Sequence, residues 1–115
     1  MDIMRREEIL SSIISRQATL NDYSLRVQFE LKYGDSANLS GALLDYFITS
    51  GVNNNIDRLD MVKECMLQLE DNWLLFFYDN MDRKVLPSTP IPQSCKSILT
   101  EDVQGKFNFI ENPYS

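Results

Sequence analysis

The most constraining pattern in this sequence is a strict alternation of apolar and polar side chains over residues 23–33. The alternating residues are Tyr23, Ser24, Leu25, Arg26, Val27, Gln28, Phe29, Glu30, Leu31, Lys32 and Tyr33. A period of two places every apolar side chain on one face of a strand and every polar one on the other. We therefore expect a long amphipathic strand over 23–33, with one face against the core and the other in water.

A strand of this kind needs a partner, because a lone strand is not stable in water. The segment from Trp73 to Tyr78 is apolar at every position, so its periodicity does not distinguish a helix from a buried strand. We interpret 73–78 and 83–86 as the two arms of a hairpin that turns over residues 79–82. This hairpin would share a sheet with the strand at 23–33.

Three segments have the spacing of amphipathic helices, at 3–16, 37–50 and from 56 to at least 70. A short helical turn near 94–103 and a short strand at 106–110 are expected to follow. Before them, a proline-rich connector that contains Pro87, Pro90 and Pro92 is expected to be extended, because proline fixes the backbone and lacks an amide donor.

Together these elements predict an α+β fold. It would contain an N-terminal helix, a long amphipathic strand, two helices, a hairpin and short C-terminal elements on one small antiparallel sheet. The pattern also leaves open a mostly α fold, in which one hairpin interrupts a helical bundle. With 115 residues, of which 43% are hydrophobic, the chain is long enough for a single globular domain over 1–115.

The negative charge of the chain is concentrated in one segment. Residues 35–82 contain nine acidic side chains and two basic ones, which gives this segment a formal charge of −7, whereas the whole chain carries −6. An acidic surface of this kind attracts basic partners and repels nucleic acid. We therefore expect a basic protein partner and no direct contact with nucleic acid.

Within this segment, the helix predicted at 56–70 has an acidic outer face. At 100° per residue, Asp57, Asp60, Glu64 and Asp71 fall within an arc of about 60°. We predict that these four residues bind a partner together with Asp45, and that Leu67 or Tyr46 supplies an apolar centre. The alternative is a helix face that is only solvated.

Catalytic and metal sites have little support in the sequence. The chain has no histidine, which is the commonest general base and metal ligand, and its only cysteines are Cys65 and Cys95. We expect structural thiols, no metal, no cofactor and no enzymatic activity. The best enzyme candidate is Asp22, Glu30 and Lys32, which follow a pattern used by Mg²⁺-dependent nucleases, but such an enzyme should offer phosphate a basic surface.

Small size, acidity and the absence of histidine resemble bacterial immunity and antitoxin proteins in overall character, although no motif carries the likeness. We therefore expect a non-enzymatic inhibitor that occludes the active or nucleic-acid-binding site of a basic toxin, such as a nuclease. The alternative is a small acidic secretion-type chaperone or adaptor, which would use the edge of the strand at 23–33.

The N-terminal residues lack the apolar run and cleavage site of a signal peptide, and the longest apolar run, 73–78, is too short to cross a membrane. We therefore expect a cytoplasmic protein that makes no contact with a membrane.

Overall fold

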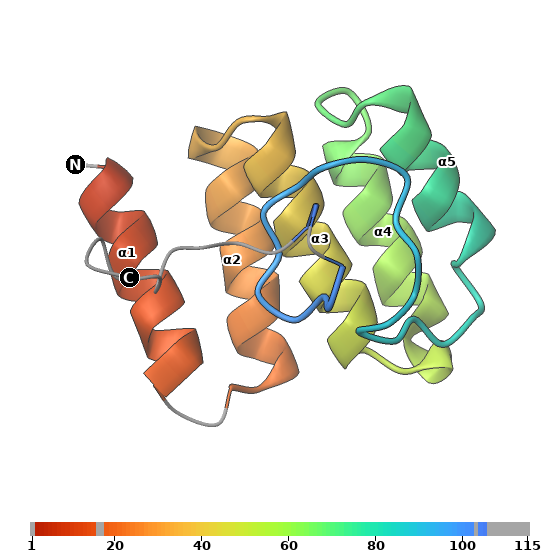
Figure 1. The fold of residues 1–115 in the computed structure, drawn as a ribbon, viewed down its shortest axis with the longest axis horizontal. Coiled ribbons are helices and arrows are strands. Elements are labelled where there is room, and N and C mark those ends of the chain that lie inside the picture. The colour runs from red at the N-terminus through yellow and green to blue at the C-terminus, as the bar shows by residue number, and fades with distance from the viewer. Residues whose placement is uncertain (1, 16–17, 103, 106–115) are drawn as a thin grey trace.

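The computed structural model describes residues 2–15, 18–102 and 104–105, and its regular secondary structure in these ranges is helical. The elements are α1 (Asp2–Ser15), α2 (Leu20–Tyr33), α3 (Ser36–Thr49), the 3₁₀ helix η1 (Val52–Asn54), α4 (Asn55–Cys65) and α5 (Asp71–Asp79). The α-helices stand side by side in chain order and alternate in direction, so that each packs against the next (Figure 1). The expected α+β fold with its antiparallel sheet is therefore wrong, and the mostly α alternative is the one observed.

The strand expected over 23–33 is helix α2. Its buried residues include Tyr23, Arg26, Val27 and Glu30, which recur three and four positions apart, as on one face of a helix. Leu25, which the alternation assigns to the core, is 55% exposed. The prediction was wrong because this helix buries two charged residues and leaves an apolar one in water.

The start of α2 is stabilised by a capping box. Asp22 donates its backbone N–H to the Thr19 hydroxyl, and the Thr19 backbone N–H donates to the Asp22 carboxylate at 2.8 Å. Such a box satisfies two amides that have no partner inside the helix. The Thr19…Asp22 spacing is therefore a helix signal that competes with the alternation.

The hairpin expected at 73–78 and 83–86 is also wrong, because residues 71–79 form α5. Trp73 and Phe77 lie one turn apart on its buried face, with their ring centroids 5.4 Å apart. Phe77 also packs on Phe47 of α3, at 4.9 Å. The helix needs only this one apolar face, so Leu75 is left exposed.

The helices expected at 3–16 and 37–50 are confirmed as α1 and α3. The helix expected at 56–70 is shorter, because α4 ends at Cys65 and a turn follows. Residues 94–102 are not helical, and the strand expected at 106–110 lies outside the described residues. In the described ranges, no helix is both long enough and apolar enough to cross a membrane.

Helix α3 is the centre of the fold, since every residue from 38 to 47 is buried. Helices α2 and α4 flank it, and the C-terminal segment crosses over it (Figure 1). The Lys96 backbone N–H donates to the carbonyl of Ala37 at 3.0 Å. A Cβ atom at Gly41 would collide with the carbonyl of Lys96, so glycine at this position allows the close approach.

Arg58 fixes helix α4 against its neighbours from inside the fold. Its guanidinium is buried and donates to the Ser50 hydroxyl and to the carbonyls of Phe47 and Ser50, at 2.8–2.9 Å. It also donates to carbonyls beyond the end of α5, which belong to Asn80, Met81 and Arg83. Because these bonds hold α4 by its inner side, the acidic residues of α4 face outward.

Candidate functional site

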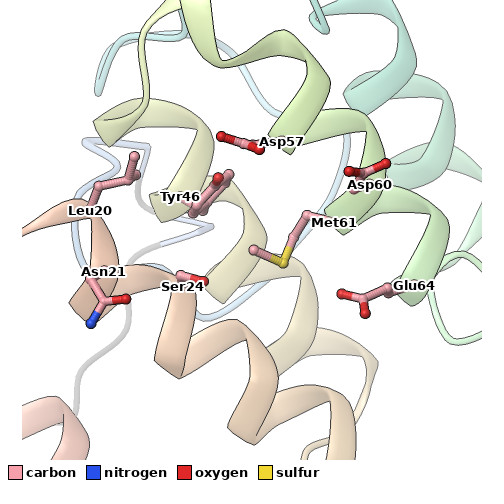
Figure 2. A pocket seen from close by; sticks show the side chains of 8 residues that line it. All are labelled: Leu20, Asn21, Ser24, Tyr46, Asp57, Asp60, Met61 and Glu64. Atoms are coloured by element: carbon pink, nitrogen blue, oxygen red, sulfur yellow. The ribbon is translucent and has the colours of Figure 1, made fainter.

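An open hollow lies between α2 and α4, with α3 beneath it (Figure 2). Its volume is about 410 Å³, which is within the usual range of ligand pockets. Eight residues line it, namely Leu20, Asn21 and Ser24 of α2, Tyr46 of α3, and Asp57, Asp60, Met61 and Glu64 of α4. We call this site the acidic hollow.

Three of the predicted partner-binding residues meet in this hollow. Asp57, Asp60 and Glu64 are exposed and lie along its α4 side, as the three- and four-residue spacing of their positions predicts (Figure 2). Among the described residues, no lysine or arginine forms an ion pair with these carboxylates. Glu64 accepts one hydrogen bond, from the Gln28 side-chain amide at 3.3 Å. The negative charge of the hollow is therefore not neutralised from within this part of the chain.

Tyr46 closes the inner side of the hollow. Its side chain is only 4% exposed, and its hydroxyl points toward Asp57 (Figure 2). No group in the described ranges forms a hydrogen bond with this hydroxyl. Burial raises the pKa of Tyr46, the charge of Asp57 raises it further, and Arg58 opposes the change. The hydroxyl therefore keeps its proton at neutral pH and can both donate and accept a hydrogen bond.

The hollow also has apolar surface. The Met61 thioether is buried beside it and receives a weak hydrogen bond from the Gln28 amide, with the nitrogen and sulfur 3.7 Å apart. Leu20, in the first turn of α2, contributes a partly exposed aliphatic group. Apolar surface next to unpaired charge suits a ligand that is amphipathic itself.

Two of the predicted partner-binding residues do not line the hollow. Leu67 lies in the turn after α4 and is 94% exposed, and Asp71 is the first residue of α5. The prediction placed them on the acidic face by extending one helix from 56 to at least 70. Because α4 ends at Cys65, that helical register stops before either residue.

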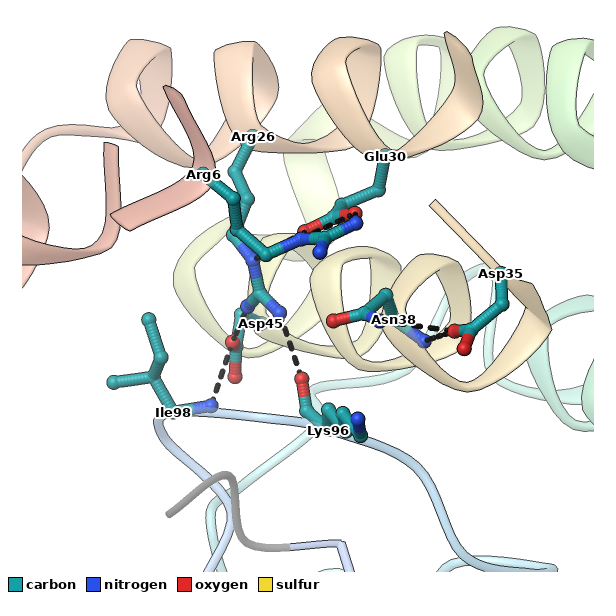
Figure 3. A network of polar contacts seen from close by, with 8 residues as sticks. All are labelled: Arg6, Arg26, Glu30, Asp35, Asn38, Asp45, Lys96 and Ile98. Carbon is teal, nitrogen blue, oxygen red and sulfur yellow. Dashed lines mark hydrogen bonds and ion pairs between the residues drawn. The ribbon is translucent and has the colours of Figure 1, made fainter. Parts of the chain in front are cut away.

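Asp45 is not on the surface at all. Its carboxylate is buried and accepts hydrogen bonds from Arg26 at 2.7 Å, from the Ser97 hydroxyl at 2.5 Å, and from the backbone N–H groups of Ile98 and Leu99 at 2.8 and 2.9 Å (Figure 3). Asp45 therefore holds the C-terminal segment on α3. A buried carboxylate with these partners does not fit the predicted role of Asp45 in a partner-binding surface.

The three residues of the nuclease pattern are not brought together. Asp22 belongs to the capping box with Thr19, and Lys32 is exposed. Glu30 is buried, where it accepts hydrogen bonds from Arg6 and lies 3.9 Å from the nearest Arg26 nitrogen (Figure 3). In the described ranges, no three acidic or cysteine side chains come close enough together to hold a metal ion.

The sequence prediction missed the residues that α2 contributes to the site, which are Leu20, Asn21 and Ser24, and also missed Met61. The Thr19…Asp22 capping box was the signal that could have placed the first turn of a helix here. The packing of α2 beside α4 has no local signal, because it is a tertiary contact.

No protein-family model matches this chain, and no curated protein and no solved structure matches it. Any proposal for its function therefore rests on the residues of the hollow.

Proposed function

We propose that this chain is a non-enzymatic binding protein that captures a basic protein partner at the acidic hollow. One observation carries the proposal. Three carboxylates line one side of a hollow in which, among the described residues, they have no cationic partner, and the hydroxyl of the nearly buried Tyr46 beside them has no hydrogen bond.

The arrangement of charges along the hollow does not stabilise the fold. Like charges three and four positions apart on a helix cost a few tenths of a kcal/mol per pair, and a lysine four positions after an acid would stabilise the helix instead. This cost disappears if a cationic group of a partner fills the hollow.

Association with a basic partner follows from the same charges. Carboxylates gathered in a concave site focus the electric field and speed the encounter with an oppositely charged surface. The apolar surface of Met61 and Leu20 then adds affinity once water leaves the hollow.

The narrower expectation, inhibition of a basic toxin such as a nuclease, stays a prediction. The chaperone alternative loses its structural basis, because the strand edge at 23–33 that it requires is helix α2. No described feature favours it over capture at the hollow.

The proposal is tested by reversing charge inside and outside the hollow. The variant Asp60→Lys/Glu64→Lys is compared with Asp71→Lys/Asp79→Lys, in which the same change of charge falls on exposed residues of α5 that do not line the hollow. Each tagged protein captures partners from the cells that produce it, and a retained protein is then purified and its affinity is measured directly.

We expect the hollow variant to lose the partner and the α5 variant to keep it, with similar melting temperatures for both. If the hollow variant still captures the partner, the proposal is wrong. Equal loss in both variants would also count against it, since it would indicate attraction to net charge alone.

A further inference from the structure

We infer that the acidic hollow accepts the side chain of an arginine that the partner presents, and that it prefers arginine to lysine. This inference rests on the proposed function and adds the chemistry of the group that is bound.

The first argument is the number and spread of the acceptors. Asp57, Asp60 and Glu64 follow α4 over two turns, or about 10 Å, and the Tyr46 hydroxyl lies beside Asp57 at one end of this row (Figure 2). Ser24 adds a second hydroxyl from α2. A guanidinium presents five N–H donors in a fixed plane and can reach several of these acceptors at once.

The second argument is the environment of the Tyr46 hydroxyl. Tyr46 is more than nine-tenths buried as a residue, its hydroxyl is directed into the hollow, and the described residues leave that hydroxyl without a partner. A guanidinium held by Asp57 could donate to this oxygen with a second N–H group. A lysine ammonium is a compact charge that keeps its water strongly, so it gains less from a partly buried hydroxyl.

The third argument is the apolar wall. Met61 and Leu20 line the hollow together with the ring of Tyr46. The three methylene groups of an arginine can pack on such a wall while the charged end reaches the carboxylates. The thioether of Met61 is flexible and polarizable, so it adapts to the shape of the inserted side chain.

The charge of the site also predicts which residues of the partner surround this arginine. Three carboxylates carry more charge than one guanidinium neutralises, so further basic residues of the partner should lie around the inserted side chain. The described acids do not form a cluster that could hold a metal ion.

The inference is tested with blocked peptides of glycine and serine that differ only at one central position, which carries arginine, lysine or citrulline. Citrulline keeps the shape of arginine and removes its charge. We expect calorimetric titration at low ionic strength to show about tenfold tighter binding of the arginine peptide than of the lysine peptide. The citrulline peptide should bind most weakly.

Two variants locate the contact. Asp60→Asn should weaken the arginine peptide about tenfold, whereas Asp71→Asn, which makes the same change outside the hollow, should leave its affinity unchanged. Tyr46→Phe should weaken it about threefold without lowering the melting temperature, because the hydroxyl has no partner to lose; Tyr78→Phe on α5 is the matched control.

Equal binding of the arginine and lysine peptides would overturn this inference, and so would an unchanged affinity in both Asp60→Asn and Tyr46→Phe. Neither result would contradict the proposed function, which is tested separately by the charge-reversed variants. The two ideas are therefore separable by experiment.

Discussion

Arg26 donates a 2.7 Å hydrogen bond to Asp45, and both side chains are closed to solvent. The same guanidinium donates to the carbonyl of Lys96 at 2.7 Å, and Asp45 receives the backbone N–H groups that follow Ser97 (Figure 3). One buried ion pair therefore joins α2, α3 and the C-terminal segment. Tyr46, which lines the hollow, directly follows Asp45 in α3.

Removal of the Asp45 carboxylate should destabilise the fold strongly. The variant Asp45→Ala breaks the buried ion pair and leaves Arg26 with the more distant Glu30 as its carboxylate neighbour, and breaking a buried pair typically costs about 3–5 kcal/mol. The free energy of unfolding, measured in urea, checks this value. The double variant Arg26→Met/Asp45→Leu should lose less than Asp45→Ala, since it leaves no unpaired charge. A loss well below 1 kcal/mol in Asp45→Ala would show that the junction is not formed in solution.

Gly41→Ala should displace the C-terminal segment from α3. The added Cβ would collide with the carbonyl of Lys96, and overpacking of this kind typically costs about 1–3 kcal/mol. Limited proteolysis should then cut the C-terminal segment earlier than in the native protein. The matched control is Gly51→Ala, where the nearest atom to a new Cβ is 3.9 Å away, and this change should leave both stability and proteolysis almost unchanged.

Asp35 should stabilise the start of α3 in a manner that depends on pH. Its carboxylate accepts the Asn38 backbone N–H at 2.9 Å, and this bond lowers the pKa of Asp35 below its ordinary value of 3.8. A lowered pKa means that the contribution is fully present above pH 3.8 and disappears as the pH falls further.

We therefore expect Asp35→Ala to cost about 1 kcal/mol at neutral pH and progressively less in acid, by chemical unfolding at a series of pH values. Asp35→Asn is the control, because asparagine caps a helix equally well without a charge. A pH-independent cost in Asp35→Ala would contradict the assignment.

Both cysteines should be inert in the folded protein. Cys65 and Cys95 are free and buried, and burial raises the pKa of each thiol from 9.0 to about 12. Only the thiolate reacts with disulfide reagents, so titration at neutral pH should detect almost no thiol until denaturant is added, and two per chain afterwards. Rapid reaction of either thiol without denaturant would place it at the surface instead.

The sequence predicted local features of this protein better than its packing. The acidic face of α4 was predicted correctly for Asp57, Asp60 and Glu64, because helical spacing alone decides which residues share a face. Asp71 was misplaced because nothing in the pattern marked the end of α4 at Cys65.

The errors in fold class have a physical cause as well. The alternation over 23–33 assumes that apolar residues are buried and charged ones exposed, whereas α2 buries Arg26 and Glu30 and exposes Leu25. The buried charges are tolerable because Arg6 and Asp45 pair with them from α1 and α3. Those partners lie far away in the sequence, so no local pattern could have revealed them.

The central claim, that the acidic hollow is where this protein meets a basic partner, is tested most directly by mapping that contact. Backbone amide NMR signals of the labelled protein are followed while the captured partner is added. We predict that the signals that move lie around Ser24, Tyr46 and the stretch from Asp57 to Glu64. Changes that gather around Asp71 and Asp79, or that spread evenly over all exposed acids, would contradict it.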